Sequence, residues 1–227
     1  MRSRVSDVNP WVRASETAQP LAEELRALAS PPLRAVTEPR RVKPQPGIES
    51  PERADRLPRR QLDAGTAASV RLWWLGVHGG AGESTLEQLL ENSRAAGHAW
   101  PVSGPGTATL PRVALVARTN ANGLKAAQLA ATEWAGETVR ADLLGLVLIA
   151  DVPGRLPRAL RELAELVAGG VPRVWHLPWV EGWRQGQDAS AHRGPRGLRV
   201  LLSELDGLLD VEEPLTEPIG DAYVASG

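Results

Sequence analysis

The residues best suited to chemistry form one short stretch, "HGGAGEST", at positions 78–85. It follows the apolar run "RLWWLGV" and precedes leucines at helical spacing. Between a strand and a helix, such glycines present backbone N–H groups to a phosphate, and a hydroxyl at the helix start can hold Mg²⁺. A tight turn without a ligand is the alternative. The predicted phosphate-binding residues are Gly79, Gly80, Gly82, Ser84 and Thr85.

Composition excludes several other kinds of site. The absence of cysteine excludes disulfides and thiolate metal sites, and the four histidines lack the spacing of metal ligands. A net charge of −1 argues against general nucleic-acid binding. No apolar run approaches the roughly 18–20 residues that span a bilayer, and "MRSRVSDVNPWVR" lacks a signal-peptide core. We expect a cytoplasmic protein without a membrane span; its many arginines and few lysines suggest a GC-rich bacterial genome.

The elements that must position the glycine loop alternate along the chain. Apolar runs predict strands at 70–77, 112–117, 143–150 and 172–180, and 3.6-residue periodicity predicts helices at 85–96, 122–135, 156–170 and 197–209. Strands that are apolar on both faces indicate a mainly parallel sheet with helices on both sides. The prediction is a three-layer α/β fold. Because phenylalanine is absent, tryptophan is expected to fill the core.

Three regions are expected along the chain. Residues 1–68 read as a disordered extension rich in proline and arginine, interrupted by a short helix in "SETAQPLAEELRALAS". Deletion of residues 1–65 is expected to cost little stability. Residues 69–210 form the α/β domain. Residues 211–227 are an acidic tail, since no basic residue follows Arg199. A protein partner is expected to bind through the extension, which contains Trp11, or through the tail.

"HGGAGEST" resembles the deviant Walker A loop, K-G-G-x-G-K-[ST]-T, of the MinD/ParA group of P-loop ATPases. "VALVARTNANGLKAAQLAA", "LLGLVLIAD" and "VWHLPWVEGWR" are similar to later segments of that group, so the resemblance covers about residues 70–210. It implies a truncated P-loop NTPase-like fold in which the loop glycines wrap the phosphates of ATP or ADP. Ser84 would ligate Mg²⁺ only when nucleotide is bound, and Thr85 would support the α-phosphate side.

Two residues depart from that pattern. His78 stands where the family has a lysine that crosses a dimer, and Glu83 where it has a lysine on the β- and γ-phosphates. One charge about 4 Å from a phosphate is worth roughly 4 kcal/mol at an effective dielectric near 20, part of which a carboxylate turned outward would recover. The segment "GHAWPVSGPGTATLP" is too short for the family's switch segments and acidic Walker B strand. Asp151 is expected only to start the turn "DVPGRLP".

The leading hypothesis is a degenerate, non-hydrolysing P-loop protein that binds nucleotide or regulates a partner, with no catalytic residue. We expect a monomer or a dimer indifferent to ATP. One alternative is an adaptor scaffold that binds no nucleotide. Another is a weak ATPase in DNA or protein positioning, conjugation or secretion, with an arginine in place of the lysine.

Overall fold

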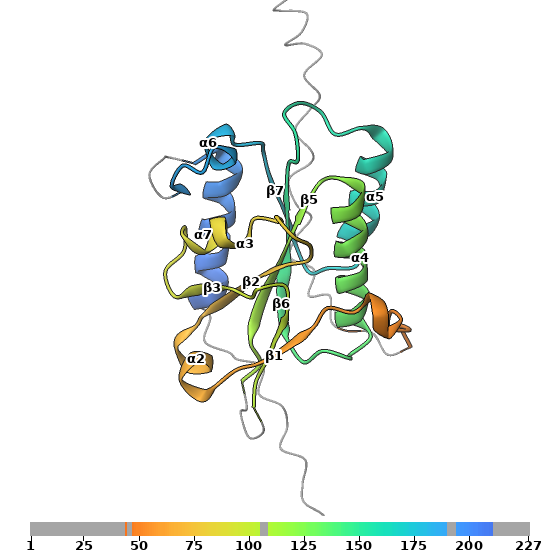
Figure 1. Cartoon of the computed structure of the whole chain (residues 1–227), viewed down its shortest axis with the longest axis vertical. Coiled ribbons are helices and arrows are strands. Elements are labelled where there is room, and N and C mark those ends of the chain that lie inside the picture. The colour runs from red at the N-terminus through yellow and green to blue at the C-terminus, as the bar shows by residue number, and fades with distance from the viewer. Residues whose placement is uncertain (1–43, 45–46, 105–108, 190–193, 211–227) are drawn as a thin grey trace, which may run out of the picture. The chain divides into compact units, whose positions relative to one another are not determined.

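A five-stranded parallel sheet forms the central layer of the domain (Figure 1). The computed structural model describes residues 44, 47–104, 109–189 and 194–210, which all belong to one compact unit, Pro39–Gly227. The strands follow the order β3–β2–β5–β6–β7, and all neighbours are parallel. Their bounds are Ser93–Ala95 (β3), Leu72–Gly76 (β2), Arg112–Arg118 (β5), Asp142–Ile149 (β6) and Val174–Leu177 (β7).

The strands are apolar on both faces because both faces are covered. All five residues of β2 are buried, as are the five central residues of β5. Such runs are typical of parallel sheets that lie between helix layers. The four strands predicted from the sequence are all present, within a few residues at each end. The predicted α/β class, with a mainly parallel sheet flanked by helices, is confirmed.

Helices form a layer on each side of this sheet (Figure 1). α4 (Ala121–Ala135) and α5 (Arg158–Ala168) pack on one face, in an apolar cluster that includes Trp73 and Leu75 of β2. α3 (Glu83–Glu87), α6 (Glu181–Arg184) and α7 (Arg196–Asp210) lie on the opposite side. The cluster on this side contains Trp74 of β2 and leucines of α7.

Tryptophan fills the core, as the sequence predicts. The buried indoles are at most 4% exposed, and four of them donate their N–H to a partner in the protein. Trp74, for example, donates to Ser93 Oγ at 2.9 Å, and Trp134 to the carbonyl of Ala141 at 3.1 Å. These bonds matter because a buried polar group without a partner costs about 1–3 kcal/mol. The buried tryptophans are Trp73, Trp74, Trp100, Trp134 and Trp175.

The helix predicted at 85–96 is wrong in extent. Helix α3 ends at Glu87, Asn92 has a left-handed φ of 55°, and the chain then forms β3 beside β2. Leu86 is fully buried, as the helical pattern predicts. The residues after the turn instead form the hydrogen bonds of a parallel ladder with β2. The amide of Ala96, for instance, donates to the carbonyl of Trp74 at 2.8 Å. Pairing with a buried strand outweighs a local helical pattern here.

The segment 47–68 is also corrected, because it is part of the folded domain. It contains a short 3-10 helix, Arg53–Asp55, strand β1 (Arg59–Gln61) and helix α2 (Ala64–Ser69). β1 pairs in parallel with a second strand that the sequence did not reveal, β4 (Trp100–Val102), and Leu62 is buried in the core. The segment combines polar bonds with a few apolar residues, such as Leu57 and Leu62, that follow no regular spacing, so an apolar pattern did not predict it.

One buried carboxylate holds this segment in place. Glu133 of α4 is 1% exposed and accepts hydrogen bonds from the amide of Leu57 at 3.2 Å and the indole of Trp100 at 3.0 Å. Its other oxygen pairs with Arg59 Nη2 at 3.3 Å. The guanidinium of Arg60 lies 4.8 Å from the ring centre of Trp73. The first residues of the domain are therefore bonded to α4, β4 and β2.

Several predictions concern residues outside the described part of the chain. They are the disorder of residues 1–43, the helix in "SETAQPLAEELRALAS", the role of Trp11 and the acidic tail at 211–227. Within the described residues, no helix has both the length and the apolar character that a membrane crossing requires.

Candidate phosphate-binding edge

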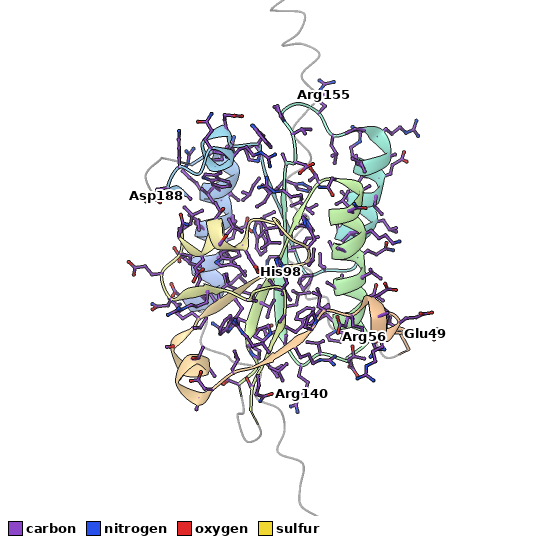
Figure 2. All side chains as sticks on the ribbon, viewed as in Figure 1. Glu49, Arg56, His98, Arg140, Arg155 and Asp188 are labelled. Carbon is purple, nitrogen blue, oxygen red and sulfur yellow. The ribbon has the colours of Figure 1, made fainter. Side chains whose placement is uncertain are left out.

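The glycine loop lies where the connections of the sheet change direction. After β2 the chain passes along one face to β3, and after β5 it passes along the opposite face to β6. β2 and β5 are neighbours, so their carboxyl ends flank a topological switch point, the place where open α/β sheets bind ligands. In Figure 2, Arg155 marks this end of β6 and Arg140 the opposite end. We call residues 77–82, 118–120 and 150–151 the carboxyl edge.

The loop adopts a glycine-dependent conformation. Gly80 and Gly82 have left-handed φ values of 72° and 109°, and the amide of Ala81 donates to the carbonyl of His78. A Cβ at Gly82 would lie 2.9 Å from Ile149 Cδ1, whereas a Cβ at Gly79 or Gly80 would meet nothing within 4 Å. The φ of 109° favours glycine at position 82, and the open space leaves room for a ligand above the two others.

The two hydroxyl residues of the predicted site follow directly. Ser84 is exposed and Thr85 is half-buried, both in the first turn of α3. The five predicted phosphate-binding residues thus lie in the glycine loop and in the first turn of α3. Because α3 is only five residues long, its dipole adds little to the binding of an anion. Among the described residues there is no group of three or more histidine and acidic side chains that could hold a metal. A Mg²⁺ ion would need oxygens from the ligand in addition to Ser84.

Glu83 does not point outward. It is 9% exposed, and its Oε2 accepts a hydrogen bond of 2.8 Å from the amide of Gly76. Its Oε1 lies 3.7 Å from Nε2 of His98, whose Nδ1 lies 2.7 Å from the carbonyl of Gly76. Figure 2 shows His98 near the middle of the domain. The carboxylate is therefore bound to the end of β2, and the expected outward rotamer is not adopted.

His78 is bonded within its own chain. Its Nε2 accepts the amide of Arg118 at 3.0 Å, and its Nδ1 lies 2.9 Å from the carbonyl of Gly79. These partners require Nε2 to be the acceptor and Nδ1 the donor, as in a neutral imidazole. A Cβ at Gly123 would lie 2.9 Å from Nε2, so α4 packs closely against the ring. The ring joins the glycine loop to the end of β5.

Arg118 is the residue that sequence reasoning missed at this edge. It ends β5, and its guanidinium donates from Nε to the carbonyl of Gly80 at 3.4 Å and from Nη1 to that of Ala150 at 3.1 Å. Burial lowers the pKa of this guanidinium, an effect opposed by Asp151 and reinforced by the positive charge of Arg184. The available signal was an arginine at the end of the apolar run "RVALVAR".

Residues 70–202 match the model of a family described as "Family of unknown function (DUF6668)". The chain belongs to this family. No curated protein and no solved structure matches it. The DUF6668 region extends from just before β2 into α7, so it includes the whole carboxyl edge. The folded segment 47–69 precedes the DUF6668 region, although it packs on α4 and β4.

A cavity of the folded domain lies elsewhere. Its volume is about 630 Å³, and residues 69–70 and 87–94 line it beside β3. None of these residues belongs to the carboxyl edge, and most of the lining is polar. The chemistry of the loop, rather than an enclosed cavity, is what marks the carboxyl edge as a candidate site.

Proposed function

We propose that this protein binds the phosphate groups of a nucleotide such as ATP or ADP at the carboxyl edge, does not hydrolyse it, and acts by regulating a protein partner. The observation that carries the proposal is the glycine loop at the switch point, with open space above Gly79 and Gly80. Backbone amides at such a place form an anion-binding surface without any side-chain charge.

The same residues argue against hydrolysis. Glu83 replaces the lysine that would follow the charge developing on the transferred phosphoryl group. Hydrolysis also needs a residue that orients the attacking water and an acidic residue that holds the metal. The strands on either side of β2 do not end in acidic residues, since β3 ends at Ala95 and β5 at Arg118. Turnover would therefore lack several of its usual groups.

A protein partner follows from the same reasoning. A domain that binds nucleotide without turnover can regulate a partner by presenting different surfaces in its bound and free states. The extension of residues 1–43 and the acidic tail of residues 211–227 flank the described part of the chain and differ from it in charge and proline content. They are the segments that we propose for partner binding.

Thermal unfolding with and without nucleotide tests the proposal. A ligand present at 100 times its Kd stabilises the folded state by about 2.7 kcal/mol. We expect ATP and ADP with Mg²⁺ to raise the Tm at millimolar concentration, with no phosphate release above background. Mg²⁺-dependent hydrolysis that disappears in Ser84→Ala would contradict the proposal and support the weak ATPase instead.

An adaptor scaffold that binds no nucleotide is the second candidate. It is favoured by one observation, namely that the side chains of His78 and Glu83 are both bonded inside the protein and hold the loop without any ligand. An unchanged Tm at millimolar ATP and ADP would support the adaptor.

A further inference from the structure

We propose that Arg118 and Arg184 together bind the phosphate group of the ligand, and that Arg118 supplies the positive charge that the glycine loop lacks. This inference rests on the proposed function and names the residues that would give that site its affinity. It also places the ligand phosphate toward β5 and β6, on the side of the loop away from Glu83.

Arg118 has the position that this role requires. It leaves β5 at the switch point, and its guanidinium lies between the carbonyl of Gly80 in the loop and that of Ala150 after β6. Its backbone amide is fixed by His78 at 3.0 Å. An arginine held at both the backbone and the guanidinium loses little further freedom on binding, so its remaining N–H groups are preorganised for a ligand.

The chemistry of the group suits a phosphate. Both described bonds of the Arg118 guanidinium go to carbonyl oxygens and use Nε and Nη1, and Nη2 makes no hydrogen bond among the described residues. A guanidinium presents parallel N–H groups that match two oxygens of a phosphate, and such charge-assisted bonds are about twice as strong as neutral ones. Half-burial strengthens them further because solvent screens the charges less.

Arg184 and Asp151 complete the local charge pattern. Arg184, at the end of α6, is exposed, and Asp151, after β6, is half-buried. α6 follows the carboxyl end of β7, the parallel neighbour of β6, so Arg184 lies at the same edge of the sheet as Arg118 and Asp151. The charges of both residues act on that of Arg118. Two guanidinium groups against one carboxylate leave a net positive charge, which an anionic ligand would neutralise. The backbone amide of Asp151 donates to Thr119 Oγ1 at 3.2 Å, which joins the end of β6 to the end of β5.

Glu83 lies on the opposite side of β2. Its carboxylate is bonded to Gly76, whose amide points toward the β3 side, because the next amide, that of Val77, donates to Val116 of β5. A phosphate bound by Arg118 would therefore be separated from this negative charge by the end of β2. The arrangement lets one loop contain a glutamate and still attract an anion.

Isothermal titration of the full-length chain with ADP, and separately with inorganic pyrophosphate, tests the proposal. Arg118→Gln should weaken binding of each probe by about tenfold or more, since a charge-assisted bond is worth about 1.5–3 kcal/mol. Arg184→Gln should weaken it by about threefold, because exposed charges contribute less. Arg161→Gln, an exposed arginine of α5, is the matched control and should bind like the unmodified protein.

The outcomes separate this inference from the proposed function. If the unmodified protein binds neither probe, the proposed function fails. If it binds ADP and both glutamine variants bind equally well, the arginine pair is overturned while the proposed function stands. If the protein binds ADP but does not bind pyrophosphate, the arginine pair is overturned too, because phosphate groups alone would then not be recognised.

Arg118→Gln also removes two bonds to backbone carbonyls, so its ligand-free Tm is measured in parallel. If that variant does not fold, Arg184→Gln decides the question, because Arg184 is exposed and its replacement leaves the loop intact. A second readout is the dependence of the Kd on salt. Losing a phosphate contact should reduce that dependence in both variants, which a purely structural role of the arginines would not do.

Discussion

Oε2 of Glu83 lies 2.8 Å from the amide nitrogen of Gly76 and accepts its hydrogen bond. Strand β3 ends at Ala95, so no neighbouring strand continues to this amide, and the glutamate takes the place of the missing ladder acceptor. A residue that interrupts the phosphate-binding pattern thus completes the edge of the sheet. Glu83 therefore has a structural role at this position, in addition to repelling a phosphate group.

Glu83→Ala should lower the free energy of unfolding by about 1–3 kcal/mol, because the buried amide of Gly76 would lose its acceptor. Glu83→Gln should cost less, since its amide oxygen can still accept the bond. Chemical denaturation measures both, with Glu87→Ala in the same helix as the control. Equal stability of Glu83→Ala and the unmodified protein would show that the bond contributes nothing.

Glu83→Lys should change stability and affinity in opposite directions. A lysine cannot accept the Gly76 amide, so the Tm without ligand should fall. Without a bond to Gly76, the longer lysine side chain can turn toward the loop, and its positive charge should then improve ATP binding by about tenfold or more, since tenfold needs only about 1.4 kcal/mol. We expect no turnover, because neither strand beside β2 ends in an acidic residue. Unchanged ATP affinity in titration calorimetry would contradict this prediction.

ATP should leave the oligomeric state unchanged. Both ring nitrogens of His78 are occupied within the chain, by the amide of Arg118 and the carbonyl of Gly79, so the ring is not available to a second copy. Sedimentation velocity with and without ATP measures this, and His78→Ala should sediment like the unmodified protein. An ATP-dependent dimer that disappears in His78→Ala would show that the residue crosses an interface after all.

Two deletions should differ sharply in stability. Removing residues 1–46 leaves the described contacts of Leu57, Arg59 and Leu62 in place, so little change in Tm is expected. Removing residues 1–62 takes away the Leu57 amide and the Arg59 guanidinium and leaves Glu133 with only the indole of Trp100, and breaking a buried ion pair in this way typically costs about 3–5 kcal/mol. Thermal unfolding compares the two. Equal Tm values would show that segment 47–62 is not needed by the fold.

Apolar periodicity alone was sufficient to predict the main frame of this protein. The four longer strands, the helices that follow β5 and β6, and the buried tryptophans each depend on local patterns of a few residues. Strands such as "RVALVAR" are apolar throughout because both faces are covered, and such a pattern can be read without knowing the partners. The glycine loop could be predicted for a similar reason, since the spacing of its glycine, serine and threonine residues indicates such a loop without knowledge of distant contacts.

The tertiary structure decided what depends on contacts between distant residues. β3 forms where its backbone pairs with β2, and β1 forms where it pairs with β4 and Arg59 reaches Glu133. The inward direction of Glu83 depends on where β3 stops, and the place of Arg118 over the loop depends on β2 and β5 being neighbours. Polar bonds of this kind leave no periodic trace in the sequence, because each one is formed by residues that only the folded chain brings together.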